Sequence, residues 1–187
     1  SPTVANCAFA ANAANDGGGM HNTESSPTVM NCTFVRNKGS YDGGGMYNTE
    51  SSVLTVTNCV FLENTARGGA GIYSDGSSLA VTNCILWDNT PDDLCVPDGT
   101  PTVTYCLFRG HHSGEGNIDG NPLFVDVEAG DLRPAVGSPC LDTGTSTGAP
   151  GDDIRGVVRP QGAGVDMGAY EITAAELAEM DGDSDGM

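Results

Sequence analysis

Basic residues are scarce in this chain. Seven lysines and arginines stand against 25 aspartates and glutamates among 187 residues, so the formal net charge is −18. A surface this acidic repels polyanions, which argues against nucleic acid and anionic lipid as partners. Long apolar runs are missing as well. No stretch approaches the ~20 residues of a membrane helix, so we expect no membrane span.

Common site motifs are also missing. No two cysteines have the C-x-x-C spacing that is typical of metal sites. The glycine-rich blocks lack the lysine and helix that follow a phosphate-binding loop. Aromatic content is only 6%, which is lean for a globular enzyme. The chain starts at Ser1 within a repeat and without a signal peptide, which we interpret as a processed or partial chain.

An internal repeat is the strongest signal that the sequence contains. Five cysteines recur with spacings of 25, 27, 25 and 22 residues, and each has a Val three residues earlier and a Phe or Leu two residues later. In the first four copies an Asn also follows the Cys by five residues. The members are Val4, Val29, Val56, Val81 and Val103; Cys7, Cys32, Cys59, Cys84 and Cys106; Phe9, Phe34, Phe61, Leu86 and Phe108; and Asn12, Asn37, Asn64 and Asn89.

The period inside each repeat predicts strands. Cys7 and Phe9 are two residues apart, as are Gly18 and Met20 in the glycine-rich block "GGGMHN", which recurs as "GGGMYN" and "GGAGIYS". About three short strands fit into each unit of 22–27 residues. The sequence therefore predicts an all-β parallel solenoid, in which equivalent residues stack about 4.8 Å apart.

Stacking gives each recurring residue a role. Val, Cys and Phe are expected to form buried columns, and Asn is expected at corners, where amides bond to one another and tolerate a left-handed backbone. For the five repeated cysteines we weighed a metal site, disulfides and a packing column. The packing column is favoured because parallel side chains suit neither alternative. Cys95 and Cys140 lie outside the repeat and could pair with each other.

The quoted repeats resemble those of bacterial right-handed parallel β-helix proteins related to polymorphic outer-membrane proteins. Segments such as "GNIDGNPLFVD", "DDIRGVVRP" and "GVDMGAYE" resemble the closing coils of surface proteins that carry a choice-of-anchor module. The resemblance implies a right-handed β-helix, export and a surface location, and it implies no catalytic residues. We divide the chain into regular coils (1–110), irregular closing coils with a C-terminal cap (111–171), and a tail (172–187).

The tail predicts a short helix and a calcium motif. Thr173 and Glu176 have capping-box spacing, and Ala174 begins a segment of good helix formers. Asp181, Asp183 and Asp185 then match the first positions of a calcium loop and resemble dockerin-type motifs. The acidic residue of the twelfth position is missing, so the alternative is a solvated acidic linker. Calcium is the one cofactor that the sequence suggests.

Three classes of function remain open. The leading hypothesis is a non-enzymatic structural solenoid, extracellular or at the cell surface, whose copies stack head to tail into filaments because the first coil begins without a cap. The second is an adhesin that binds extracellular polysaccharide through its few aromatics, Tyr41, Tyr47, Tyr73 and Trp87. The third is a pectate-lyase-like polysaccharide lyase or hydrolase, for which Arg36, Lys38 and Arg67 are the basic candidates; we expect these to be solvated charges.

Overall fold

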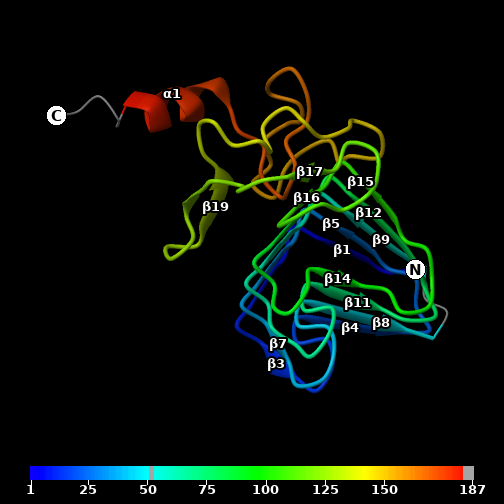
Figure 1. Cartoon of the computed structure of the whole chain (residues 1–187). Helices are drawn as coiled ribbons and strands as arrows, with labels where there is room; N and C mark the ends of the chain where they lie inside the picture. The colour runs from blue at the N-terminus through cyan, green and yellow to red at the C-terminus, as the bar shows by residue number, and fades with distance from the viewer. Residues whose placement is uncertain (51–52, 183–187) are drawn as a thin grey trace.

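The computed structural model describes residues 1–50 and 53–182 and contains a parallel β-solenoid of about four turns. Each turn has three faces, so that the solenoid is roughly triangular when viewed near its axis (Figure 1). We name the turns coil 1 (residues 1–25), coil 2 (26–50), coil 3 (53–77), coil 4 (78–100) and an incomplete coil 5 (101–110). This architecture confirms the predicted fold class.

The three faces are parallel sheets. The first sheet contains β1 (Thr3–Ala5), β5 (Thr28–Met30), β9 (Val53–Thr57), β12 (Ser78–Thr82) and β15 (Thr102–Thr104). The second contains β2 (Ala8–Ala10), β6 (Thr33–Val35), β10 (Val60–Leu62), β13 (Ile85–Trp87), β16 (Leu107–Phe108) and β17 (Ile118–Asp119). The third contains β4 (Met20–Thr23), β8 (Met46–Thr49), β11 (Ile72–Ser74) and β14 (Leu94–Cys95). A short pair, β3 (Ala13–Ala14) and β7 (Lys38–Gly39), joins the second and third sheets.

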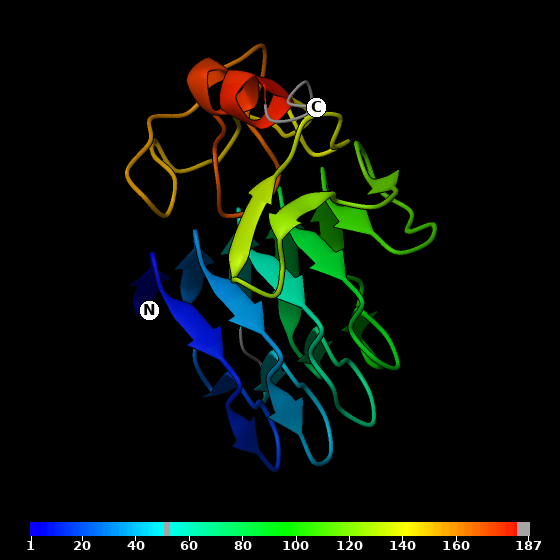
Figure 2. The ribbon, with the colours of Figure 1, turned by 90° about the vertical axis from the view of Figure 1, so that its left-hand side faces the viewer.

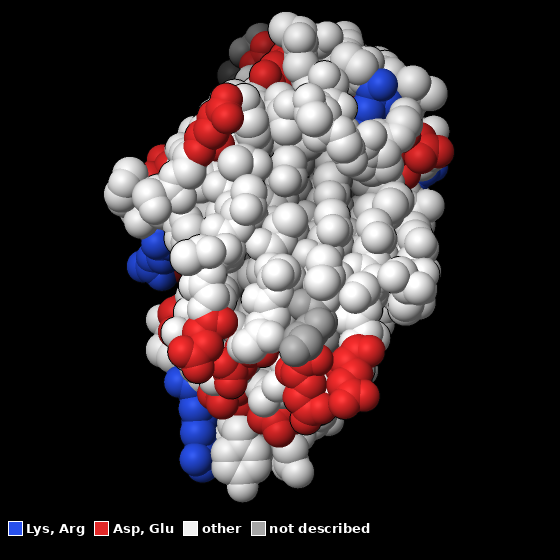
Figure 3. Space-filling model, turned by 90° about the vertical axis from the view of Figure 1, so that its right-hand side faces the viewer, with Lys and Arg blue, Asp and Glu red and all other residues white. Residues whose placement is uncertain are grey.

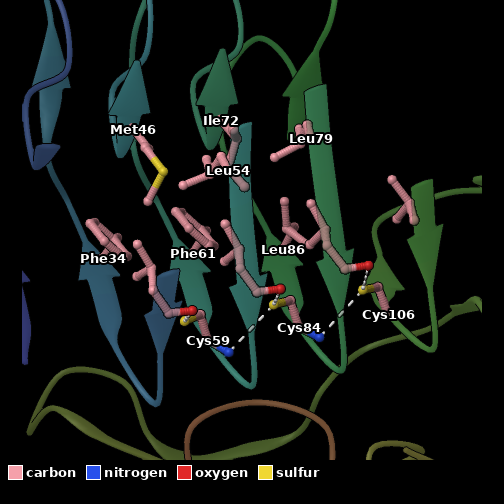
Figure 4. Close-up of a cluster of buried hydrophobic side chains, with 14 of the residues drawn as sticks. Phe34, Met46, Leu54, Cys59, Phe61, Ile72, Leu79, Cys84, Leu86 and Cys106 are labelled. Atoms are coloured by element: carbon pink, nitrogen blue, oxygen red, sulfur yellow. Dashed lines mark hydrogen bonds between the residues drawn. The ribbon is translucent and has the colours of Figure 1, made fainter. Parts of the chain in front are cut away.

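The predicted columns form in the predicted register. Val4 pairs with Val29, and Phe9 pairs with Phe34, in the parallel ladders that join coils 1 and 2. The rings of Phe34 and Phe61 stack with centroids 4.6 Å apart and nearly parallel planes. The Val, Cys and Phe columns are fully buried in coils 2 and 3, where Figure 4 shows the stacked side chains of Phe34 and Phe61, but they are only partly buried in coil 1. The packing interpretation of the repeated residues is therefore confirmed.

The cysteine column adds hydrogen bonds to its packing. The backbone N–H of Cys59 donates to Sγ of Cys84 at 3.4 Å, and the same contact joins Cys84 to Cys106 at 3.3 Å (Figure 4). Burial raises the pKa of Cys59 and Cys84, so both remain neutral thiols. Cys95 and Cys140 are free as well, and the pairing considered for them is wrong. Cys140 lies in the core beneath the C-terminal segments, whereas Cys95 lies on β14.

Two asparagine columns divide the corner functions that the sequence analysis assigned to one residue type. Asn6, Asn31, Asn58 and Asn83 have the left-handed backbone, with φ between 49° and 54°. The other column, which contains Asn12, Asn37, Asn64 and Asn89, supplies the amide ladder: each side-chain nitrogen donates to the next Oδ1 at 2.8–3.0 Å. In this second column the residue just before each Asn takes the positive φ.

The closing segments take a different place from the one expected. Residues 122–172, which we call the lateral cap, pack along the side of the solenoid and cover the outer face of the second sheet, rather than closing its C-terminal end (Figure 2). Their hairpin, β18 (Phe124–Asp126) and β19 (Asp131–Pro134), contributes Leu132 to a second core cluster. Val60, Ile85 and Leu107 point outward into this cluster and are fully buried. The large apolar side chains on the outside of these coils explain the lateral position.

The predicted helix forms as α1 (Ala174–Gly182), and its capping box is confirmed. The backbone N–H of Glu176 donates to the Thr173 hydroxyl oxygen at 3.2 Å, and the backbone N–H of Thr173 donates to Glu176 Oε2 at 2.9 Å. Among the described residues no helix has the length and apolarity to cross a bilayer. Asp181, the first residue of the predicted calcium motif, lies in α1, and Asp183 and Asp185 lie outside the described residues.

Candidate functional surfaces

Three columns of the solenoid end at its C-terminal side on residues that the repeat does not contain. The last cysteine, Cys106, donates its backbone N–H to Oδ1 of Asn117 at 2.9 Å, where earlier coils offer a Cys sulfur. The last ladder amide, Asn89, donates to Oδ1 of Asp93 at 2.7 Å. The ring of His112 stacks on Phe108 with centroids 4.5 Å apart. These three residues terminate the Cys, Asn and Phe columns.

A cavity of about 460 Å³ opens beside these terminators, over the end of the third sheet. It forms because the chain passes from β16 to β17 without building a third-sheet strand over β14. Asp88 and Arg109 form an ion pair at its wall with N and O 2.5 Å apart, and His111 and His112 complete one side. The cavity presents several carboxylates around one guanidinium, which suits a polar or cationic ligand better than an anion.

Asp93 lines this cavity and has a shifted pKa. Burial raises its pKa to about 6, and the hydrogen bonds that it accepts from Asn89 oppose part of that shift. Raised carboxyl pKa values mark candidate acid catalysts, but they also occur at structural positions. Here both the side chain and the backbone N–H of Asn89 donate to Asp93 Oδ1. The carboxylate therefore has a structural task at the end of the ladder.

His21 and two half-buried tyrosines form a column on the outside of the third sheet. His21 packs edge-on against Tyr47 at 4.9 Å, and Tyr47 and Tyr73 are stacked at 5.2 Å with planes 7° apart. Burial, together with the charges of neighbouring aspartates, raises the pKa of both tyrosines. Stacked rings hide their faces from solvent and present their edges. The column therefore offers little of the flat ring surface on which a sugar could stack.

The other aromatic candidates are separate from this column. Tyr41 is exposed and lies under Arg67, whose guanidinium carbon is 4.8 Å from the ring centroid. Trp87 is partly buried against the core of the lateral cap. The structure therefore brings together Tyr47 and Tyr73 but not all four aromatics that the sequence analysis singled out.

The outer face of the first sheet is flat and free of charged side chains (Figure 3). Thr28 and Thr55 are adjacent in the ladder, as are Thr57 and Thr82, and the hydroxyls of Thr82 and Thr104 lie 3.4 Å apart. Acidic residues gather along one border of this face in the space-filling view. Thr57 is buried, but Thr55 is exposed and Thr28, Thr82 and Thr104 are half-buried, so the face presents spaced hydroxyl and methyl groups to solvent, which suits an uncharged and extended partner.

The arginines are engaged in ion pairs or ring contacts. Arg36 contacts both Glu63 and Glu128, with N and O 2.6 Å apart in each pair. Arg159 is buried, pairs with Glu171 at 2.8 Å, and donates to the carbonyl oxygen of Gly168. Arg67 lies over Tyr41. A lyase that acts on an acidic polysaccharide needs cationic groups free to meet the substrate, and these side chains already have partners.

The lateral cap holds the largest set of interacting charges. Asp166 accepts from the backbone N–H groups of Asp142 and Ile172, and burial raises its pKa to about 6. Burial alone would also raise the pKa of Glu176, but ion pairs with Arg155 and Arg133 and its helix-capping bonds lower it to about 2. These carboxylates bind backbone and arginine donors of the cap itself.

No set of three or more His, Cys, Asp or Glu side chains within residues 1–50 and 53–182 is arranged to hold a metal ion. The predicted calcium motif falls mainly outside that range, so calcium binding stays a prediction. Sequence reasoning missed Asp93, Asn117 and His112 as column terminators. The only signal for them was the place where the repeat loses its register, after Asn89 and after Phe108.

Comparison with known proteins adds one finding. Searches among curated proteins and among solved structures gave no match. A family model described as the right-handed β-helix region matches residues 1–121, which is more than half of the chain and spans all of the stacked strands. The stacked parallel sheets, their in-register columns and this match together show that the chain belongs to the right-handed β-helix family.

Proposed function

We propose that this chain is a non-enzymatic structural β-solenoid that acts as a rigid spacer, extracellular or at the cell surface. One observation carries the proposal: the carboxylates with strongly shifted pKa values are bound to structural partners. Asp93 ends the asparagine ladder, and Asp166 and Glu176 hold the lateral cap together. Of these three, Asp93 alone lines the 460 Å³ cavity, whereas in an enzyme such groups would converge on one space where a substrate could sit.

Stiffness is the property that this architecture supplies. The parallel ladders join consecutive coils in constant register, and the buried columns continue without interruption from coil 2 to coil 4. Each coil therefore contacts its neighbours through main-chain bonds, stacked side chains and amide ladders at once. An acidic surface adds solubility, and the resemblance of the closing segments to surface proteins supports a location outside the cell.

The activity test uses the whole chain and a panel of neutral and acidic polysaccharides, with and without calcium. We expect no change in polymer length or reducing ends. The variants Asp88→Asn and Asp93→Asn are included because both residues line the 460 Å³ cavity, where the pKa of Asp93 is raised. Turnover that either substitution abolishes would show that the cavity is a catalytic site and that the spacer proposal is wrong.

End-to-end association of copies, tuned by calcium, belongs to the same proposal. We propose that copies contact one another through the side of coil 1 that faces away from coil 2. Val4, Cys7 and Phe9 are only partly buried there. Bound calcium would lessen the repulsion between copies of net charge −18. Light scattering during a calcium titration measures this: particle mass should rise with calcium and fall on addition of chelator. A constant monomeric mass at all calcium concentrations would contradict it.

Carbohydrate binding is a second candidate, favoured by the uncharged face of the first sheet. Thr55 and Thr102 are exposed on that face, in one column of small side chains that also contains Thr28 and Ala80. We expect retention of the chain on an insoluble neutral polysaccharide to fall with Thr55→Lys. The same substitution at Thr65, an exposed threonine outside this sheet, is the control. Equal retention of both variants would exclude the face as a binding surface.

A further inference from the structure

The outer face of the second sheet is covered by the lateral cap over some coils but not over the first. In coils 3 and 4 the outward residues include Val60, Leu62 and Ile85, which are buried against the cap. The equivalent residues of coil 1 are Ala8 and Ala10, and both are exposed. The solenoid surface thus continues past the edge of the cap with smaller side chains.

A groove lies where this uncovered surface meets the cap. It has a volume of about 380 Å³, and its lining is mainly apolar. Ala8, Ala10 and Val35 form the solenoid wall, and Leu132 and Tyr170 form the wall from the cap. At its rim Arg36 is already paired with Glu128, so the groove does not demand a charged ligand. We call this space the coil-1 groove.

Asparagines with a left-handed backbone bind the lateral cap where it covers this surface. The amide of Asn31 donates to the carbonyl oxygen of Asp152 at 2.8 Å. Asn58 donates to the carbonyl oxygen of Asp166 at 3.1 Å, and Asn83 donates to that of Thr145 at 2.8 Å. In coils 2, 3 and 4 the same side chain therefore holds the backbone of the lateral cap.

Asn6 is the member of this column in coil 1. It has the same left-handed backbone, with φ of 54°, and its side chain is exposed without a hydrogen-bond partner among the described residues. Asn6 occupies the same corner as Asn31, Asn58 and Asn83, whose side chains reach outward to the cap, and Ala8 and Ala10 are exposed on the same side of the adjoining strand β2. Coil 1 thus has the same amide donor and apolar surface that bind the cap in coils 2, 3 and 4. In coil 1, however, the cap does not cover them.

We propose that the coil-1 groove binds an extended apolar polypeptide segment, which continues the lateral cap over coil 1. A main-chain carbonyl of the segment accepts a hydrogen bond from Asn6, as cap carbonyls do from Asn31, Asn58 and Asn83. A large apolar side chain of the segment lies over Ala8 and Ala10, which take little space. The occupant is assigned as polypeptide because the site continues an interface whose other members bind polypeptide backbone.

The test uses the whole chain and a labelled peptide with the sequence of residues 164–172, GVDMGAYEI. This segment is the probe because its own Asp166 carbonyl and Met167 side chain already fit the covered part of the surface. Fluorescence anisotropy should show saturable binding. A peptide with Met→Asp at the apolar position is the matched negative probe, and it should bind weakly.

Two variants locate the binding. Ala8→Trp fills the groove and should weaken the peptide at least about tenfold, and Asn6→Ala should weaken it about threefold to tenfold by removing one hydrogen bond. Ala14→Trp is the control, because Ala14 is equally exposed but lies on β3, away from the groove. Circular dichroism and unfolding midpoints verify that each variant folds. Absence of saturable binding, or equal binding to Ala8→Trp and the unchanged chain, would overturn the proposal.

Discussion

The two ends of this solenoid are finished differently. At the N-terminal side, Val4, Cys7 and Phe9 are partly buried and their columns open onto the outer side of coil 1. At the C-terminal side, Asn117 and Asp93 replace the next member of the Cys and Asn columns. Within residues 1–50 and 53–182 the same columns therefore run from coil 1 onward, and the residues seen to stop them lie at the C-terminal side.

The difference shows that each column has a direction. Along the amide ladder, every Asn donates toward the C-terminal side, from Asn12 to Asn37 and onward. The last donor needs a group that accepts without having to donate further, and a carboxylate meets that need. The Cys column has the same direction, because each backbone N–H donates to the sulfur of the next coil, and Asn117 offers an oxygen in its place.

The largest effect on stability is expected when a Phe in the middle of the aromatic column is truncated, compared with the Phe of coil 1. Phe61→Ala should lower the free energy of unfolding by about 3–5 kcal/mol, because Phe61 is fully buried between neighbouring coils. Phe9→Ala should cost clearly less, because Phe9 is only partly buried. Urea unfolding of both variants measures the two losses. Equal losses would mean that coil 1 is covered in solution.

The amide ladder provides the next comparison. Asn64→Ala should destabilise the chain by about 1–3 kcal/mol, because the side chain and backbone N–H of Asn37 both lose their acceptor inside the protein. Asn12→Ala should cost less, since Asn12 is exposed and stands at the open side of the ladder. Thermal unfolding under one buffer condition compares them. A larger loss for Asn12→Ala would contradict the direction assigned to the ladder.

The pH dependence of stability tests the closed side. The folded-state pKa values of Asp93 and Asp166 are raised to about 6, above the ordinary value near 3.8. The folded chain therefore takes up these protons first, so both groups increase stability as the pH falls from about 7 to 4 and lose that contribution as it rises through 6. We expect unfolding at pH 5 to require about 1.3 kcal/mol more per group than at pH 7.

The variant Asp93→Asn isolates the contribution of the ladder terminus. It should remove part of the pH dependence and leave the part that belongs to Asp166. Below about pH 4 the trend should reverse, because the pKa of Glu176 is lowered to about 2 in the folded chain, so that the unfolded chain takes up this proton first and gains stability relative to the folded one. Unfolding midpoints from pH 3 to 8 would follow both changes. An unchanged pH profile in Asp93→Asn would mean that Asp93 is not buried at the column end.

The smallest effect is expected at the helix. Glu176→Gln removes charge from a residue that caps α1 and contacts Arg133 and Arg155, and we expect a loss of about 1 kcal/mol or less, confined to α1 and its neighbours. Glu179→Gln is the control, because Glu179 is exposed on the same helix. Hydrogen exchange of the α1 amides should accelerate in the first variant only.

The columns could be predicted from the sequence because a solenoid converts a linear repeat directly into stacking. The spacing of Cys32, Cys59 and Cys84 predicts which residues of successive coils pair, and the strands that follow Cys32 and Cys59 pair in that register. The lateral cap and the column terminators could not be predicted in this way. Asp93 acts on Asn89 from four residues further along, and Asn117 acts on Cys106 across an irregular loop, so neither occupies a repeat position. The outward Val60 and Ile85 were a readable sign of a covering layer, because such residues seldom face water.

The lateral cap has a consequence for how the molecule comes apart. In a solenoid held only by contacts between neighbouring turns, a terminal turn can detach while the rest persists, so unfolding proceeds stepwise. Here one continuous segment is bonded to Asn31, Asn58 and Asn83, which belong to three successive turns. No one of these turns can peel away without also breaking the cap. We therefore expect coils 2, 3 and 4 to unfold together with the cap in one cooperative step. The covered coils should accordingly resist proteases that cleave locally unfolded ends.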